Sequence, residues 1–295
     1  MLMASVVSAQ TFKEWQDPKV NAVNRAPMHA NYFAFESAEA AQKCKTQSTN
    51  YMPLTGMWKF YWVENADQRP TDFFTLSYND ASWAKMEVPA MWELNGYGDP
   101  IYVNVGYAWR GNFRNEPPKV PNEQNHVGSY RREVEIPAEW SGRDIMLNIG
   151  AAVSNVYVWV NGKFVGYSED SHLGASFDVT KFVKPGKNLI ALQIFRWCDG
   201  TYLEDQDLWR LSGISRDVEL VARQKARLQD VMITPALENN YTDGKLSVEM
   251  EFSSAVKSAT VKLLDPAGKP VAETKVTPSK GKASHTFEVK APAKW

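Results

Sequence analysis

Short runs of β-branched and aromatic residues recur between residues 51 and 222. The run Met57 to Val63 (MWKFYWV) contains the residue types that strands favour. Val156 to Val160 (VYVWV) is apolar at both parities, so both faces of its sheet are expected to be covered. Asn161-Gly162 follows at once and predicts a hairpin, because a type I′ turn needs positive φ at both positions. The returning strand is predicted at Phe164 to Tyr167.

The same pattern continues to the end of this region. Pro185-Gly186 marks a turn before a predicted strand at 188–196, and Val218 and Leu220 alternate with their neighbours in the same way. Many short strands without a long helical period predict an antiparallel sandwich or jelly roll. We therefore assign residues 51–222 to one all-β domain.

A change in composition predicts a second domain at 223–295, where aromatic residues become sparse. Apolar residues alternate over 246–252 and again over 260–264, Asp265 to Gly268 (DPAG) is a predicted turn, and Phe287 begins another strand. These are four or five strands, whereas an immunoglobulin-like sandwich needs about seven strands and about 100 residues. The second domain is therefore expected to be an incomplete immunoglobulin-like β-sandwich.

The first 50 residues are predicted to form two segments. Met1 to Ala9 (MLMASVVSA) is small and apolar and ends like a signal cleavage site. We interpret 1–9 as the end of a truncated signal peptide, which predicts an exported, periplasmic bacterial protein, although a ragged N-terminus fits the same residues. Residues 10–50 are polar and are interpreted as an arm over the next domain, with a short helix at 38–43 capped by Ser37.

Composition argues against several classes of protein. The 295 residues carry 33 Lys and Arg against 34 Asp and Glu, so no basic excess exists to neutralise nucleic-acid phosphates. No later segment has an apolar run near the length of about 18 residues that a membrane-spanning helix needs. Cys44 and Cys198 are expected to be free thiols, although an exported protein could pair them. The 11 Trp, 12 Tyr and 13 Phe suit carbohydrate binding or a sandwich core, and the core is favoured.

The acid-rich segment 199–207 (DGTYLEDQD) is the most tempting place for chemistry. Glu204 and Asp207 could be interpreted as the two catalytic carboxylic acids of a glycosidase. In retaining enzymes these carboxyl groups lie about 5 to 5.5 Å apart. The same acids could cap turns or pair with Arg196 and Arg210, and we favour this structural interpretation because four acids in one loop are a weak spatial signal. The spacing fits no EF-hand calcium loop, and the isolated histidines suggest no catalytic triad.

Four longer stretches are far more specific as sequence motifs than the acid-rich segment alone. They are Trp92 to Asn104 (WELNGYGDPIYVN), Gly128 to Ile136 (GSYRREVEI), Asn161 to Val179 (NGKFVGYSEDSHLGASFDV) and Arg196 to Val218 (RWCDGTYLEDQDLWRLSGISRDV). Together they resemble the N-terminal part of the large β-galactosidases of glycoside hydrolase family 2. The similarity extends from about Glu14 to Trp295.

The resemblance implies an enzyme that hydrolyses terminal non-reducing β-D-galactosides with retention. Its domains would be a sugar-binding jelly roll, an immunoglobulin-like domain, a TIM barrel and further β domains. Both catalytic glutamates and the Mg²⁺ ligands of the family lie on the barrel, so no catalytic residue is expected in this chain. The chain is expected to be inactive alone, to need the missing C-terminal catalytic region as a partner, and to form a homo-oligomer when full length.

Two residues carry over by their place in these motifs. Asn104 matches the asparagine that the jelly roll extends into the galactose pocket, and Asp199 matches the aspartate that contacts the sugar. Asp199 would also ligate a Na⁺ ion beside the sugar's 6-hydroxyl, with the other ligands on the missing barrel, so the chain holds at most a partial Na⁺ site. Residues 106–109 (GYAW) depart from a stretch that commonly carries Tyr-Pro, and Cys198 stands where serine is usual.

The remaining acids of the segment then acquire a structural role. We expect an ion-pair network that holds the loop of Asp199 in place. Its members would be Glu204, Asp205, Asp207, Arg210 and Arg216.

Two hypotheses from other classes remain open. The chain could be a stand-alone carbohydrate-binding module, or a structural or adhesive β-sandwich surface protein. A downstream reading frame that encodes a barrel would favour the enzyme, and calorimetry with galactose or lactose would separate the other two.

Overall fold

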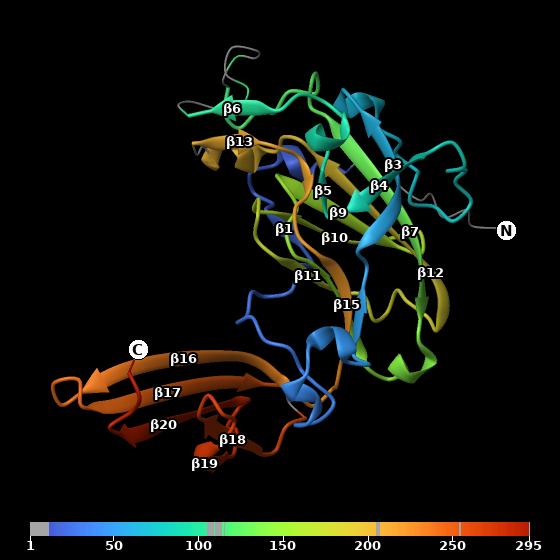
Figure 1. Cartoon of the computed structure of the whole chain (residues 1–295). Coiled ribbons are helices and arrows are strands. Elements are labelled where there is room, and N and C mark those ends of the chain that lie inside the picture. Colours follow the sequence, from blue (N-terminus) through green and yellow to red (C-terminus); the bar gives the residue numbers. More distant parts are fainter. Residues whose placement is uncertain are drawn as a thin grey trace. The chain divides into compact units, whose positions relative to one another are not determined.

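The computed structural model describes residues 12–104, 109, 114, 116–204, 207–253 and 255–294. These residues form two units: 12–26 with 46–222, and 27–45 with 223–294 (Figure 1). The described part of the segment interpreted as an arm, 10–50, is thus divided between the two units. The predicted signal peptide at 1–9 and residues 106–108 of the GYAW stretch lie outside the described residues.

The first unit is built on two antiparallel sheets. The larger has the strand order β1 (Ala22–Val23), β10 (Lys163–Glu169), β9 (Asn155–Val160), β12 (Gly186–Phe195), β7 (Val127–Ile136), β3 (Gly56–Val63) and β4 (Ala84–Val88). The smaller has the order β11 (Ala175–Asp178), β8 (Asp144–Ile149), β15 (Val218–Arg223) and β2 (Tyr51–Pro53). The non-consecutive strand order is that of a jelly-roll sandwich, as predicted.

The predicted hairpin after residue 160 is present. Asn161 and Gly162 have φ angles of 50° and 79°, and Lys163 pairs with Val160 across the turn. Every residue of β9 is buried, as expected from its apolar residues at both parities. One face of the larger sheet packs on the smaller sheet, and its other face is covered by a second cluster that contains Trp15, Phe73 and Trp159. The many aromatic residues therefore serve mainly as core.

Two short strand pairs and several 3₁₀ helices complete the first unit. The strand pairs are β6 (Ile101–Val103) with β13 (Leu208–Arg210), and β5 (Ala90–Met91) with β14 (Gly213–Ile214). The 3₁₀ helices are η1 (Glu14–Gln16), η4 (Ala66–Gln68), η5 (Glu93–Asn95), η6 (Ala138–Trp140) and η7 (Asp199–Leu203); η3 (Lys45–Gln47) spans the boundary between the units. The pair β6–β13 and the helix η7 carry the predicted site residues.

The second unit is an immunoglobulin-like sandwich of two small sheets. Three strands, β16 (Leu228–Glu238), β17 (Asp243–Phe252) and β20 (Lys282–Lys290), form one sheet. The hairpin of β18 (Ala259–Leu264) and β19 (Pro270–Val276) forms the other. The predicted turn after β18 closes through the Asp265 carboxylate, which accepts the Ala267 and Lys269 amides at 2.9 and 2.8 Å. The all-β fold class is confirmed.

The predicted helix at 38–43 is shorter than expected. Only η2 (Ala40–Gln42) forms, as a 3₁₀ turn, and the Ser37 hydroxyl accepts the Ala40 amide at 3.2 Å. The two cysteines form no disulfide: Cys44 is exposed and Cys198 is buried. In the part of the chain that the structure describes, no helix has the length and apolarity to span a membrane.

Candidate functional site

The end of β12 is fixed by a neighbouring segment just before Asp199. The Arg196 amide donates to the His126 carbonyl at 2.8 Å. Asn125 closes a ring with Trp197, accepting its amide at 2.9 Å and donating to its carbonyl at 3.1 Å. Because Asn125 and its neighbours enter β7 directly, the sheet sets the position at which the Asp199 loop starts.

The next residues turn the chain into η7. Thr201 Oγ1 accepts the Cys198 amide at 3.1 Å, and the Thr201 amide donates to the Cys198 carbonyl at 3.0 Å. This reciprocal cap satisfies groups that a short helix otherwise leaves open. Burial, and then the negative charge of Glu169, raise the pKa of the Cys198 thiol far above its usual value, so the thiol stays protonated. Cys198 therefore serves packing and not chemistry.

Asp199 is the first residue of η7 and is 8% exposed. Its Oδ1 atom is buried and has no hydrogen-bond partner. Burial raises the pKa of Asp199, while hydrogen bonds from its own backbone amide and from the Glu169 carboxyl act in the opposite direction. An unsatisfied buried carboxylate oxygen is unfavourable by about 1–3 kcal/mol or more, so this atom is suited to receive a ligand.

Asn104 follows directly after β6 and is exposed. Strand β6 pairs antiparallel with β13, with Tyr102 opposite Trp209. Strand β13 begins five residues after the end of η7, so the strand pair brings Asn104 to the loop that carries Asp199, and Figure 1 shows β6 and β13 side by side. The tertiary structure thus places both predicted sugar-binding residues at one end of the jelly roll.

The side chain of Glu204 does not form the ion pair that was predicted for it. The Glu204 carboxylate accepts the Ser171 amide at 2.7 Å and the Ser171 hydroxyl at 2.5 Å. Asp207 accepts the Tyr102 hydroxyl, and Arg216 donates to the His172 carbonyl at 3.0 Å. Arg210 Nη1 donates to the Glu204 carbonyl at 2.6 Å, so hydrogen bonds contribute to holding the loop. Asp205 lies outside the described residues.

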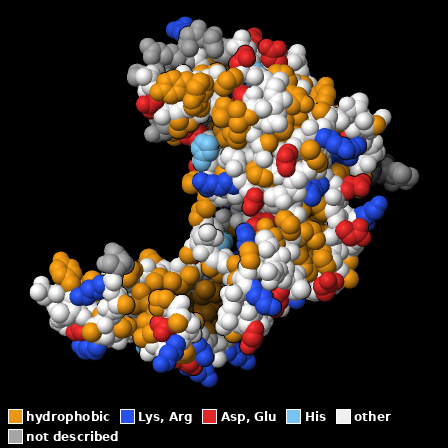
Figure 2. Space-filling model, in the orientation of Figure 1, with side chains coloured by type: hydrophobic (Ala, Val, Ile, Leu, Met, Phe, Trp, Pro, Cys, Tyr) orange, Lys and Arg blue, Asp and Glu red, His pale blue; other side chains and the backbone are white. Residues whose placement is uncertain are grey.

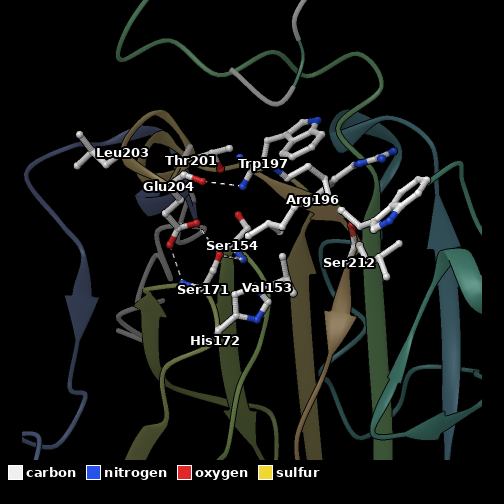
Figure 3. Close-up of a pocket in the computed structure, with 14 residues that line it drawn as sticks. Val153, Ser154, Ser171, His172, Arg196, Trp197, Thr201, Leu203, Glu204 and Ser212 are labelled. Atoms are coloured by element: carbon white, nitrogen blue, oxygen red, sulfur yellow. Dashed lines mark hydrogen bonds between the residues drawn. The ribbon is translucent and has the colours of Figure 1, made fainter. Parts of the chain in front are cut away.

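A pocket of about 290 Å³ lies beside η7. Figure 3 shows Glu204 and Ser171 on one side of it and Arg196 and Ser212 on the other. Its lining is Val153, Ser154, Ser171, His172, Arg196, Trp197, Thr201, Leu203, Glu204 and residues 208–212. Hydroxyl groups beside indole faces suit a polyhydroxylated ligand.

Arg196 and His126 form a buried contact behind this pocket. Arg196 Nη1 lies 3.0 Å from His126 Nδ1, and Nη2 donates to the Asp99 carbonyl at 2.7 Å. Burial, and then the positive charge of Arg196, lower the pKa of His126 to about 4. His126 is therefore neutral at physiological pH and accepts the Arg196 hydrogen bond through Nδ1.

Sequence reasoning missed the side chain next to Asp199. Glu169 ends β10, is 7% exposed, and its carboxyl is hydrogen-bonded to Asp199. Burial raises the pKa of Glu169 to about 8, and the charge of Asp199 adds to that shift. The sequence held one signal: Glu169 lies two residues after Tyr167 on the same strand, so the two side chains are expected on the same face, and both are buried.

The first unit has the fold of a jelly-roll β-sandwich, with β6, β13 and η7 gathered at one end of it. The family model described as "Glycosyl hydrolases family 2, sugar binding domain" matches residues 51–224. The chain therefore belongs to glycosyl hydrolases family 2.

Two of the related sequences are β-galactosidases. The β-galactosidase of Priestia megaterium is 40% identical over 246 residues, which are 83% of this chain and 24% of the relative. The β-galactosidase of Aeromonas hydrophila subsp. hydrophila is 35% identical over 314 residues, covering 100% of this chain and 30% of the relative. The chain thus spans less than a third of the length of these relatives.

Two similar solved structures are β-glucuronidases. A β-glucuronidase of Bifidobacterium dentium, complexed with coumarin-3-O-glucuronide, superimposes with a TM-score of 0.62 at 18% identity, over 84% of this chain and 43% of that structure. β-Glucuronidase 2 of Bacteroides uniformis superimposes with a TM-score of 0.62 at 20% identity, over 83% of this chain and 28% of that structure. At this identity the likeness establishes the fold alone.

Proposed function

We propose that this chain is the N-terminal, sugar-binding region of a β-galactosidase that hydrolyses terminal non-reducing β-D-galactosides with retention. The observation that carries the proposal is the match to β-galactosidases along 83% and 100% of the chain at 40% and 35% identity. Asp199 and Asn104 at one end of the jelly roll support it, because a carboxylate and an amide bind sugar hydroxyls well.

In this proposal the chain binds substrate and does not carry out the reaction. The two acids that could be drawn as a glycosidase pair have other contacts: Glu204 binds Ser171, and Asp207 binds Tyr102. The proposal assigns catalysis to the barrel that the family resemblance implies, and the chain alone is expected to show no turnover.

Asp199 fits as one ligand of a Na⁺ site. Its Oδ1 atom is a buried carboxylate oxygen without a partner, and hard cations prefer such oxygens. Among the residues that the structure describes, no group of three or more His, Cys, Asp or Glu could hold a metal ion. In this proposal Asp199 would share Na⁺ with ligands from the catalytic region, and Mg²⁺ is assigned to no residue of this chain. When bound, Na⁺ would supply positive charge beside the 6-hydroxyl, while Asp199 and Asn104 orient the galactose.

A hybrid enzyme tests the proposal. The chain replaces the matching N-terminal part of the Priestia megaterium β-galactosidase, and hydrolysis of a chromogenic β-galactoside is measured against Na⁺ concentration. We expect an active hybrid and an inactive isolated chain. Asp199→Asn is expected to raise KM and the half-saturating Na⁺ concentration by about 10- to 100-fold, because it removes a charged ligand.

Three results would contradict the proposal. An unchanged sodium dependence in the Asp199→Asn hybrid would remove the role of Asp199. Hydrolysis by the rigorously purified isolated chain would show that it is not a non-catalytic region. An inactive hybrid together with galactose binding by the isolated chain in calorimetry would indicate a stand-alone carbohydrate-binding module.

A further inference from the structure

The short ribbon of β6 and β13 carries two exposed aromatic side chains, Tyr102 and Trp209. They are direct cross-strand partners, so both lie on the same face of the ribbon. Their ring centroids are 5.5 Å apart, with the ring planes tilted by 54°. Tyr102 is 53% exposed and Trp209 is 57% exposed, and of the ten described tryptophans Trp209 alone is exposed. Figure 2 shows hydrophobic side chains gathered at this end of the first unit.

Hydrogen-bonding groups flank this aromatic pair. The Tyr102 hydroxyl donates to Asp207 Oδ1, which places Asp207 on the same face and holds the phenol ring in one orientation. Asn104 directly follows β6 and has the same parity as Tyr102, so it belongs to this face as well. The exposed face of the ribbon thus combines two aromatic rings with a carboxylate and an amide.

The size of the aromatic pair favours a small ligand. Two half-exposed aromatic side chains offer roughly 200 Å² of surface together. A stable protein interface takes about 800 Å² from each partner, which is far more. Trp209 also lines the pocket of about 290 Å³ beside η7, and small-molecule sites begin at about 300 Å³.

The chemistry of the face favours a sugar ring. A pyranose presents C–H groups on its faces and hydroxyls around its edge. It can therefore pack on an aromatic ring while its hydroxyls bind a neighbouring carboxylate and amide.

We propose that Tyr102 and Trp209 bind the sugar ring next to the terminal galactose, so the preferred substrates are β-galactosides whose aglycone is a second pyranose. This inference rests on the proposed function, in which Asn104 contacts the galactose. Two residues of a strand span about 7 Å, so adjacent rings of a disaccharide can contact Asn104 and Tyr102 together.

Truncation of each ring in the hybrid enzyme tests the inference. Trp209→Ala and Tyr102→Ala each remove one aromatic face, and Trp209→Phe keeps a face of the same kind. Tyr241→Ala is the matched control, because Tyr241 is 67% exposed and lies between β16 and β17 of the second unit. All these side chains are exposed, so the variants are expected to fold like the parent.

Two substrates separate binding of the second ring from a general effect on the galactose site. Lactose has a second pyranose, and methyl β-D-galactoside has none. We expect Trp209→Ala and Tyr102→Ala to raise the KM for lactose by about 5- to 10-fold, the worth of one aromatic contact, with little change in kcat. The KM for methyl β-D-galactoside should stay within about twofold, as should both KM values in Trp209→Phe and Tyr241→Ala.

A binding measurement on the isolated chain does not depend on activity. Nitrogen-15 labelling of the tryptophan indoles gives an NMR signal for Trp209, which is assigned by its loss in Trp209→Phe. This signal should shift when lactose is added and stay in place when methyl β-D-galactoside is added.

Three results would overturn the role of the aromatic pair and leave the proposed function intact. They are an unchanged KM for lactose in Trp209→Ala, a Trp209 signal that lactose does not move, and equal losses on both substrates. Equal losses would indicate that the pair supports the galactose site or packs against the catalytic region. Normal sodium dependence in Asp199→Asn would instead overturn the proposed function, and this inference with it.

Discussion

The two units of this chain bury their apolar residues in different ways. Among the described residues of the first unit, clusters of 28 and 15 buried residues cover the two faces of the larger sheet. The corresponding cluster of the second unit contains four buried residues in the described part of the chain, Val248, Met250, Val276 and Phe287. Seven consecutive residues of β16 are exposed, Met232 and Ile233 among them, and Figure 2 shows hydrophobic side chains on the surface of this unit.

The difference in burial shows which unit can hold functional side chains in fixed positions. Dense packing lowers the freedom of side chains and transmits a change of one group to its neighbours. Asp199 and Glu169 lie in such surroundings, since the residues before and beside them, Trp197, Cys198 and Tyr167, belong to the second cluster of the first unit. A sheet with an exposed face offers no comparable support. We therefore expect the first unit to carry both the stability and the sugar site.

The largest expected effect comes from truncating matched aromatic residues in the two units. Trp159 is 1% exposed and stacks on Phe74 at 5.0 Å, so Trp159→Ala should destabilise the first unit by about 4 kcal/mol. Phe287→Ala should destabilise the second unit by about 2 kcal/mol, because fewer buried neighbours surround the cavity.

The two units can be followed separately. All ten described tryptophans lie in the first unit, so fluorescence in a Trp295→Phe background reports on it during urea unfolding. Hydrogen exchange measured by mass spectrometry reports on peptides of the second unit. Equal losses of unfolding free energy in the two variants would contradict the expected difference between the units.

The next effect concerns ion pairs. In the first unit, Asp80 binds buried Arg131 at 2.7 Å and Lys59 at 2.5 Å. Burial alone would raise the pKa of Asp80, but the hydrogen bonds from Lys59 and Arg131 more than compensate and lower it. Asp80→Ala should destabilise the unit by about 3 kcal/mol, because it leaves the buried guanidinium without its anion.

The exposed pair of Lys262 and Glu273 in the second unit is the control for this prediction. Its atoms lie 2.9 Å apart and its side chains are about half exposed. Glu273→Ala should change stability by less than about 0.5 kcal/mol. Urea unfolding measures both variants, and a loss for Glu273→Ala as large as that for Asp80→Ala would contradict the expected contrast.

The smallest effect depends on pH. His126 has a pKa near 4 when folded and an ordinary value near 6.5 when unfolded, so between these values the unfolded chain binds the extra proton. The stability due to neutral His126 is complete above about pH 6.5 and is lost as the pH falls toward 4, by about 2 kcal/mol. The groups that act on it are Arg196, which contacts it, and the Glu93 carboxyl and Asp99 near Arg196.

The measurement is the free energy of unfolding of the first unit at pH 7.5 and 4.5 in the parent and in His126→Asn. The variant removes the titrating ring, so it should lose about 2 kcal/mol less than the parent between the two pH values. An identical pH dependence in both proteins would show that His126 does not contribute.

Much of the fold could be predicted because its signals are local. The strands of VYVWV and MWKFYWV, and the Asn-Gly turn, follow from side-chain parity and from the backbone preferences of adjacent residues. The helix predicted at 38–43 was shortened to a 3₁₀ turn because six residues with little burial cannot stabilise a longer one. The partners of Glu204 were also wrong, since opposite charges in a sequence do not reveal which backbone groups lie nearer in space.

The sequence by itself determined the two β domains, the strands at their centre, the membership of the family and the two residues expected to bind galactose. Local periodicity and specific motifs are sufficient for these. Only the tertiary structure decided that Glu169 lies against Asp199, that Asp199 Oδ1 lacks a partner, and that Glu204 binds Ser171. The contacts of Glu169 and Glu204 join residues 30 or more positions apart. They depend on how the strands are arranged in the sheet, which no local sequence pattern encodes.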